Sequence, residues 1–327
     1  MKRNLTLFVL VISVVLALCM GNALAAKINI DVNCTMKPGG SEEAAINKFK
    51  EIVEKKSDGR MNVKIFMSGQ LGKEKAVLEL MKIGQTQMAL TGDIFRTMFA
   101  KEYDPITIPF YLPTWEVVQA YLEGPTGKKI GQMASEKGGV IDFGPQKRAA
   151  RHMTANKKIM GPEDLKGLKM RLPAIPIWVD VWKELGALPT VIPAPEIYLA
   201  MKTGQVDSHE NSLVSPYSRK LWEVQKYIIK TGHVYFPWHW VASKKWLDGL
   251  SADDKKLISE AVQEARAYGT QIEDEKDAFY AAELKKNGME FITPDNKAIR
   301  AKALPAIQRA VDKLAPEVAA EVERLTK

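Results

Sequence analysis

The chain has 327 residues, of which 46% are hydrophobic, and a formal net charge of +8 at pH 7. A chain of this length can bury a large core and more often divides into two lobes than forms one body. Its positive charges are spread along the sequence beside acidic residues, with no basic arm and no arginine-rich helix, so nucleic acid is not an indicated partner. The modest excess of positive charge instead favours a protein that handles small anions.

The N-terminal residues 1–25 have the features of a secretory signal peptide. Two basic residues precede a short apolar run, and the small residues Ala23 and Ala25 stand where a signal peptidase cuts. A transmembrane anchor is the alternative, but the run is short and ends in small residues rather than basic ones. We predict export with cleavage near residue 25. Cys34 is then the only cysteine left, so we expect no intramolecular disulfide in the mature chain.

Strand and helix patterns alternate in the first third of the chain. Alternating apolar and polar residues predict strands, and apolar residues at helical spacing after Ser41 predict a first helix that ends at Gly59. This order favours an α/β fold with a largely parallel sheet. The predicted strands cover residues 27–34, 61–67 and 87–92, and the predicted helices cover 41–59 and 73–85.

The remainder of the chain contains further strands and several helices. A proline-rich loop leads into a helix that begins near Trp115. Ser251 and Asp253 are capping-type residues for one long helix, and a last helix starts near Asp295 and runs to the end of the chain. Because no internal repeat or long linker is present, we expect the chain to cross between two lobes more than once.

The sequence lacks the spaced motifs of common catalytic and cofactor sites. Its four histidines form no HExxH pair, and no CxxC, GxSxG, GxGxxG or phosphate-loop motif occurs. We therefore predict no metal and no cofactor. An exported hydrolase or lyase could use Ser208–Asn211, with the sequence SHEN, together with His152 or His233. A strand end that lines a cleft is the more common role for such a segment.

Two arginines lie in extended runs that contain apolar residues. Arg151 and Arg171 are 20 positions apart. An arginine presents a planar fork that can hold a carboxylate through two charge-assisted hydrogen bonds. The alternative is that each arginine forms a structural ion pair with an acid such as Glu196 or Glu210. Periodicity alone leaves both interpretations open.

Three successive segments carry a family resemblance: DLKGLKMRLP, ELGALPTVIPAPEIYLAMKTGQVDSHENSL and LWEVQKYIIKTGHVY. They resemble solute-binding proteins of the DctP type, the periplasmic subunits of tripartite ATP-independent periplasmic (TRAP) transporters. The resemblance covers nearly the whole mature chain. It implies a periplasmic protein that is not an enzyme, binds a small-molecule carboxylate and delivers it to the small and large membrane permease subunits.

The resemblance also implies an α/β fold of the periplasmic binding protein type, with two α/β lobes around a central cleft and a long hinge helix. We expect lobe I to comprise residues 26–148 plus 237–276, and lobe II to comprise residues 149–236 plus 277–327. The helix after Ser251 would contribute to the hinge.

Four residues match polar positions of the family's ligand site. Arg171, in KMRLP, corresponds to the arginine that clamps the ligand carboxylate, and Arg151 corresponds to a second arginine that often assists it. Asn211 matches an asparagine that hydrogen-bonds the same carboxylate. Glu210 is expected to be structural, orienting an arginine or the strand.

Other positions of the family's cleft carry small or apolar residues in this chain. Many sugar-acid binders have an aromatic residue and a serine where this sequence has Ala194 and Pro195, and some have polar side chains near Ala174, Gly92 and Phe95. A ligand rich in hydroxyls would lose partners there, at about 1–3 kcal/mol for each unpaired hydroxyl.

Trp178 and Trp238 fall on segments near the expected cleft, although a tryptophan taken singly more often packs a core. Together with Phe95 and Ala194 as lining residues, they favour an aromatic or apolar monocarboxylate as the ligand. A sugar acid, either a uronate or an aldonate, and a C4-dicarboxylate are the alternatives.

Overall fold

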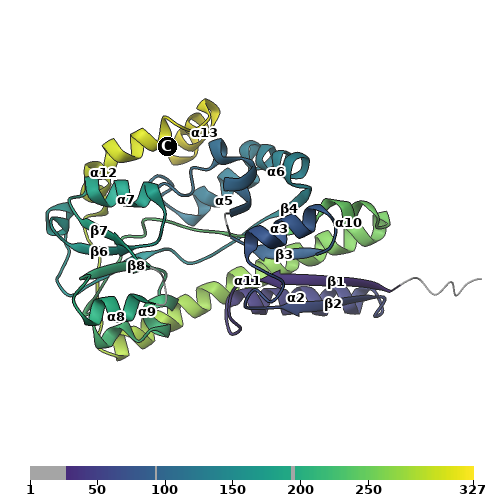
Figure 1. Ribbon diagram of the computed structural model, residues 1–327, viewed down its shortest axis with the longest axis horizontal. Helices are drawn as coiled ribbons and strands as arrows, with labels where there is room; N and C mark the ends of the chain where they lie inside the picture. Colours follow the sequence, from purple (N-terminus) through teal and green to yellow (C-terminus); the bar gives the residue numbers. More distant parts are fainter. Residues whose placement is uncertain (1–26, 93, 193–195) are drawn as a thin grey trace, which may run out of the picture.

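The computed structural model describes residues 27–92, 94–192 and 196–327 (Figure 1). These residues form two β-sheets, one of five strands and one of six, and helices pack around both. The predicted mixed α/β fold with two lobes is confirmed. The predicted signal peptide and Ala194 lie outside the described residues.

The first sheet combines a parallel and an antiparallel part. Strand β1 (Ile28–Cys34) pairs in parallel with β2 (Met61–Phe66) and with β3 (Met88–Thr91), which confirms the three strands predicted in this region. Strand β10 (Trp238–Ser243) pairs antiparallel with β3 and with β4 (Val140–Gln146). The strand order is β2-β1-β3-β10-β4, so the chain leaves this sheet after β4 and returns to it at β10.

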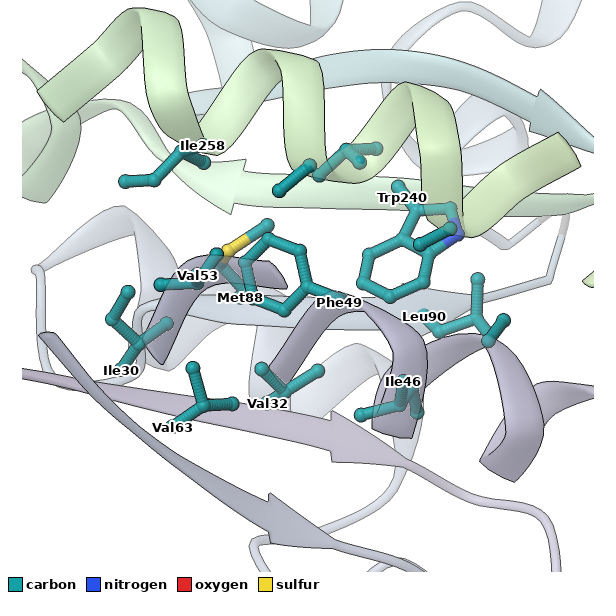
Figure 2. Packing of buried hydrophobic residues seen from close by; sticks show 14 of the residues in the cluster. Ile30, Val32, Ile46, Phe49, Val53, Val63, Met88, Leu90, Trp240 and Ile258 are labelled. Atoms are coloured by element: carbon teal, nitrogen blue, oxygen red, sulfur yellow. The ribbon is translucent and has the colours of Figure 1, made fainter. Parts of the chain in front are cut away.

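Apolar side chains of α2 (Ser41–Lys56) and of α11 (Ala252–Lys286) cover one face of the first sheet (Figure 2). The rings of Phe49 from α2 and Trp240 from β10 pack with their centroids 5.4 Å apart. Ile258 of α11 belongs to the same fully buried cluster. Burying one such side chain contributes roughly 1.5–3 kcal/mol. This cluster therefore contributes strongly to the stability of the first lobe.

The second sheet consists of six short strands. The register of β6 against its two parallel neighbours sets Arg171 beside Thr190 and His209, and the antiparallel pairing of β5 with β8 sets His152 opposite Asn211. The segments that carry the predicted polar site residues therefore lie next to each other in one sheet. In order across the sheet, the strands are β11 (Glu290–Ile292), β9 (Tyr227–Ile229), β5 (His152–Ala155), β8 (Ser208–Asn211), β6 (Lys169–Leu172) and β7 (Leu188–Val191).

Helices cover both faces of the second sheet. Trp182 of α7 (Pro176–Glu184) and Ile307 of α12 (Asn296–Val311) belong to one buried cluster with Met170 of β6. Helices α8 (Ile197–Lys202) and α9 (Val214–Ser218) lie on the opposite side of β6 and β8 from α7 (Figure 1).

The C-terminal region differs from the single predicted helix. Helix α12 ends at Val311, and a separate helix α13 (Pro316–Thr326) follows, because a proline at the first helical position starts a new helix. Val318 and Val322 of α13 pack in a cluster with residues of α5, on the first lobe. The predicted lobe bounds stay a prediction, but α13 makes its apolar contacts outside the second sheet. The other helices of the first lobe are α3 (Glu74–Lys82), α4 (Ile94–Phe99), α5 (Trp115–Glu123), α6 (Pro125–Gly138) and α10 (Lys244–Asp248).

The predicted long helix is α11, which contacts both halves of the molecule (Figure 1). The hydroxyl of Ser251 caps its first turn by accepting from the N–H of Asp254 at 3.1 Å. Its first half packs in the core of the first sheet, whereas Leu284 packs with Leu213 and Ile228 beside the second. None of the helices in the described part of the chain has the length and apolar character of a membrane span.

Candidate functional site

Arg171 is a buried cation on β6. Its neighbours Met170 and Leu172 point into the apolar core under α7, so the alternation of the strand turns Arg171 toward the other face of the sheet. The residue is 3% exposed, and its Nε–H donates to the carbonyl of Ile192 at 2.7 Å. Within the described ranges, Arg171 has no carboxylate at ion-pair distance and no hydrogen-bond partner for Nη1 or Nη2.

Burial lowers the pKa of Arg171 to about 10, because desolvation disfavours the charged guanidinium. The negative charge of Glu210 opposes this decrease, whereas the positive charges of Arg151 and Arg219 add to it. Arg171 therefore remains charged at neutral pH while the protein supplies only a distant counter-charge. A bound anion would be stabilised at such a position.

Arg151, immediately before β5, is held by Glu210 of β8. The Nε–H of Arg151 donates to Oε2 of Glu210 at 2.6 Å, and Nη2–H donates to Oε1 at 2.8 Å and to the carbonyl of Glu210 at 3.1 Å. Burial on its own would raise the pKa of Glu210, but the charge and hydrogen bonds of Arg151 outweigh it, and the pKa is about 2. The ion-pair interpretation therefore applies to Arg151, which Glu210 holds by these hydrogen bonds.

His233 supports this ion pair from the second crossing segment, residues 230–237, which joins β9 to β10. Its Nε2 lies 3.2 Å from Oε2 of Glu210, and its Nδ1 lies 2.8 Å from the hydroxyl of Thr231. Burial lowers the pKa of His233, so the ring is neutral at pH 7, and this arrangement requires Nε2–H to donate to the carboxylate while Nδ1 accepts from Thr231. The rings of Trp178 and Trp182 pack edge-on against the imidazole at 6.2 and 5.4 Å.

Asn211 ends β8 and is partly exposed. Its Oδ1 accepts from the N–H of Ser212 at 3.0 Å, which fixes the orientation of the amide. The Nδ2 group has no hydrogen-bond partner among the residues that the structure describes. Asn211 can therefore offer two N–H donors to a ligand.

Trp178, Phe95 and Trp238 are all buried. The Trp178 indole donates to the carbonyl of Thr107 at 2.8 Å, and its ring lies 4.9 Å from Cζ of Arg151, so it supports the second arginine. Phe95 has no exposed surface and packs on the ring of His239, with centroids 4.7 Å apart. In this conformation Phe95 is a core residue and offers no face to a ligand.

Trp238 begins β10 and is 3% exposed. The guanidinium carbon of Arg148 lies 4.7 Å from its ring, in a cation–π contact. One edge of the indole approaches Gly92, since a Cβ at that glycine would lie 3.7 Å from Cζ3 of Trp238. Trp238 thus lies in the first lobe, at the start of β10 and close to the end of β3.

The SHEN segment has the arrangement of a structural strand. His209 is fully buried, with Nδ1 at 3.3 Å from the hydroxyl of Thr154 and Nε2 at 3.2 Å from that of Ser215. Burial lowers the pKa of His209 to about 3, so the ring stays neutral. The described residues contain no group of three or more histidine, cysteine, aspartate or glutamate side chains that could hold a metal ion.

The family model described as "Bacterial extracellular solute-binding protein, family 7" matches residues 33–315. This match covers most of the chain, and the protein belongs to that family. The family consists of substrate-binding transport proteins of the extracellular or periplasmic space, and its members bind small acids and work with TRAP membrane permeases.

Individual relatives agree with this assignment. A solute-binding protein of Roseobacter denitrificans is 30% identical over 298 residues, which cover 90% of this chain and 91% of the relative. A solved structure of a TRAP periplasmic solute-binding protein from the same organism, with bound L-galactonate, has a TM-score of 0.75 at 29% identity and covers 92% of this chain and 99% of that one.

Two further solved TRAP periplasmic solute-binding proteins are similar to this chain. One from Ochrobactrum anthropi has a TM-score of 0.86 at 29% identity, with coverage of 92% of this chain and 97% of that chain. One from Bordetella, with density attributed to pantoate, has a TM-score of 0.77 at 28% identity, with coverage of 90% and 98%.

Sequence reasoning missed the supporting role of His233 and Thr231. The segment YIIKTGHVY has the pattern of an apolar strand, and the sequence suggests His233 only as a catalytic residue. The one signal that could have indicated a buried role is the apolar composition around a lone histidine. The pairing with Glu210 depends on where the second crossing segment lies, which the sequence does not encode locally.

Proposed function

We propose that this protein captures a small carboxylate in the periplasm by an arginine clamp and delivers it to a TRAP permease. Arg171 supplies the charge and the two outer guanidinium nitrogens that receive the carboxylate. Arg151 and Asn211 complete the polar clamp with their remaining N–H donors. The observation that carries the proposal is that Arg171 is buried and charged without a carboxylate at ion-pair distance in the described part of the chain.

Lobe closure completes the capture. A carboxylate on Arg171 of the second lobe would also contact the first lobe across the cleft, so its binding energy favours the closed state. The two crossing segments and α11, which contacts both lobes, are the elements that can bend. The closed form presents the surface that the small and large permease subunits recognise. The protein acts by binding and release, with no chemical change to the ligand.

We further propose that the ligand is a monocarboxylate with an apolar or aromatic tail. The support is the set of small residues at Gly92, Ala174 and Ala194, which offers few partners for hydroxyls. The Bordetella relative has density attributed to pantoate, a dihydroxy acid with two methyl branches, which lies between an apolar acid and a sugar acid. The L-galactonate-bound relative keeps a sugar acid as the alternative, and a C4-dicarboxylate is a third.

Export follows from the predicted signal peptide, residues 1–25, and the expected location is the periplasm. This is tested by N-terminal sequencing of the protein recovered from a periplasmic extract. A mature chain that begins near residue 26 supports export and cleavage. An intact N-terminus in the cytoplasmic fraction contradicts them.

The ligand proposal is tested by a thermal-shift screen of the purified mature chain. Pantoate, benzoate, L-galactonate and succinate represent the branched, aromatic, sugar-acid and dicarboxylate classes. A ligand that binds only the folded state raises the melting temperature by mass action. Pantoate or benzoate should give the largest shift, and a larger shift with L-galactonate or succinate would overturn the preference for an apolar tail. Recovery of each acid unchanged distinguishes binding from turnover by a hydrolase or lyase.

A further inference from the structure

The centre of α11 lies where the first crossing segment leaves the first sheet. That segment, residues 147–150, joins β4 to β5 and leads directly into Arg151. Gly269 allows the close approach of the helix, because a Cβ at this position would lie 2.5 Å from Nε2 of Gln146 and 2.8 Å from Cβ of Ala45. The helix, the end of β4 and α2 therefore meet here with no room for a methyl group.

Glu273, one turn further along α11, holds two neighbours with its two carboxylate oxygens. Oε1 accepts from the backbone N–H of Ala149 at 2.8 Å. Oε2 accepts from the hydroxyl of Ser41, the first residue of α2, at 2.5 Å. Both partners are buried, so these hydrogen bonds are partly shielded from water. A single side chain thus ties the start of a lobe I helix to the segment that precedes Arg151.

Two more residues of α11 hold the same segment. The hydroxyl of Thr270 accepts from the N–H of Lys147 at 3.3 Å, and the ammonium of Lys147 pairs with the carboxylate of Asp274 at 2.6 Å. The Asp274 side chain is 55% exposed, so this ion pair contributes little by itself. The less exposed contacts of Glu273 are the ones able to fix the geometry.

The second crossing segment is bonded to the first just beyond this point. The N–H of Arg151 donates to the carbonyl of Val234 at 3.0 Å, and the N–H of His233 donates to the carbonyl of Arg151 at 3.3 Å. A shift of residues 147–150 would therefore move Arg151, and with it the second crossing segment, residues 230–237, which carries His233.

We propose that Glu273 is a positioning residue for ligand capture, which fixes the crossing segment against α2 and α11 and so sets the axis about which the lobes close. The inference rests on the proposed lobe closure. Glu273 bonds Ser41 and Ala149 and acts on the ligand only through the segment that leads to Arg151. A carboxylate meets this need because each of its oxygens accepts a hydrogen bond, whereas a glutamine has only one acceptor oxygen.

The test measures the separation of the lobes with spin labels. Lys55 of α2 and Lys183 of α7 are exposed, one on each lobe, and the double substitution K55C/K183C gives two labelling sites. Cys34 has no exposed surface and stays unlabelled. Pulsed electron double resonance then gives the distribution of lobe separations for the free protein and for the protein in about 5 mM pantoate or L-galactonate, a concentration that also populates a complex of millimolar affinity.

Glu273→Ala should broaden the distribution of lobe separations in the free protein. It should also weaken the binding of pantoate or L-galactonate about tenfold, as expected for loss of a charge-assisted hydrogen bond that holds the binding geometry. Glu273→Gln, which keeps the side-chain shape but only one acceptor oxygen, should give a distribution between those of wild type and Glu273→Ala. The matched control is Glu275→Ala, since Glu275 is exposed on the same helix and bonds only Gln271 among the described side chains.

An unchanged distribution in Glu273→Ala, or an equal broadening in Glu275→Ala, overturns the inference. If Glu273→Ala does not fold, Ser41→Ala removes one of the two contacts, and a distribution identical to wild type then contradicts the role. The measurement on the free protein needs no ligand. If wild type binds neither acid, the branched and sugar-acid ligand classes fail, while the distribution still decides the role of Glu273.

Discussion

Arg151 and Glu210 form a buried ion pair with two parallel hydrogen bonds, at 2.6 and 2.8 Å. The protein thus neutralises this arginine internally, whereas Arg171 has no described acid at ion-pair distance. The two arginines differ accordingly in their proposed roles. Arg151 is held in place by its own chain, and Arg171 is the cation whose partner the ligand supplies.

Glu210→Gln should destabilise the protein by about 3 kcal/mol, because it leaves the buried Arg151 without its counter-charge. The measurement is the free energy of unfolding from urea denaturation, compared with wild type. Glu290→Gln is a suitable control, since Glu290 pairs with Lys158 at 3.7 Å and both side chains are more than half exposed. Equal stabilities of wild type and Glu210→Gln would contradict the importance of the pair.

The pH dependence of stability should also report on Glu210. Its pKa is about 2 in the folded protein, against an ordinary value of 4.5, so the carboxylate stabilises the fold above the higher value. This contribution is lost as the pH falls from about 4.5 toward 2. The melting temperature of wild type should therefore fall toward that of Glu210→Gln in this range. A constant difference between the two proteins from neutral to acid pH would contradict the assignment.

Arg171→Met should abolish binding of whichever test acid wild type binds, without lowering the melting temperature of the free protein. The reason is that the substitution removes a desolvated cation that has no acid beside it among the described residues, and fills the space with an apolar chain of similar length. Arg171→Lys keeps the charge but loses the planar fork, so calorimetry should show binding at least about tenfold weaker. Wild-type affinity in Arg171→Met would refute the clamp.

Trp178→Phe should cost about 1 kcal/mol of stability, because it removes the hydrogen bond to the carbonyl of Thr107 and leaves that group short of a donor. The phenyl ring keeps an aromatic face near the Arg151 guanidinium, although it is smaller than the indole. Thermal unfolding is the measurement. An increase in stability would show that the indole hydrogen bond is unimportant.

Gly269→Ala should destabilise α11 by about 1–3 kcal/mol, because the added methyl group would overlap Gln146 and Ala45. Helix propensity alone predicts the opposite sign, a gain of about 1 kcal/mol. Gly131→Ala in α6 is the matched control, since no neighbouring atom lies within 4 Å of its added Cβ and this helix should gain stability. Equal gains in both variants would show that the packing around Gly269 is loose.

Local patterns predicted the strands and helices of the first lobe well, because each has its own hydrophobic periodicity. They predicted one helix after Asp295 where there are two, although Pro316 at the first position of α13 is a local signal for the break. For the site, the pattern left open whether each arginine has an internal acid. Only the antiparallel pairing of β5 with β8 decides this for Arg151, because it brings Glu210 beside it.

Aromatic residues were the least predictable part of the site. The sequence predicts that Phe95 and Trp178 line the cleft, but burial depends on which helix face meets a neighbouring sheet, and both are almost fully enclosed. Trp178 affects the site only indirectly, because its ring packs against the guanidinium of Arg151. The identity of the ligand tail therefore depends more on the small residues than on the aromatic ones.

The single thiol of the described chain has a consequence for production and labelling. Cys34 lies in β1 with no exposed surface, and burial raises its pKa to about 12. A protonated, enclosed sulfur reacts slowly with oxidants and maleimides. Recombinant protein should therefore fold without disulfide isomerases and tolerate reducing buffers. Dyes should label cysteines introduced at the surface while Cys34 stays unlabelled.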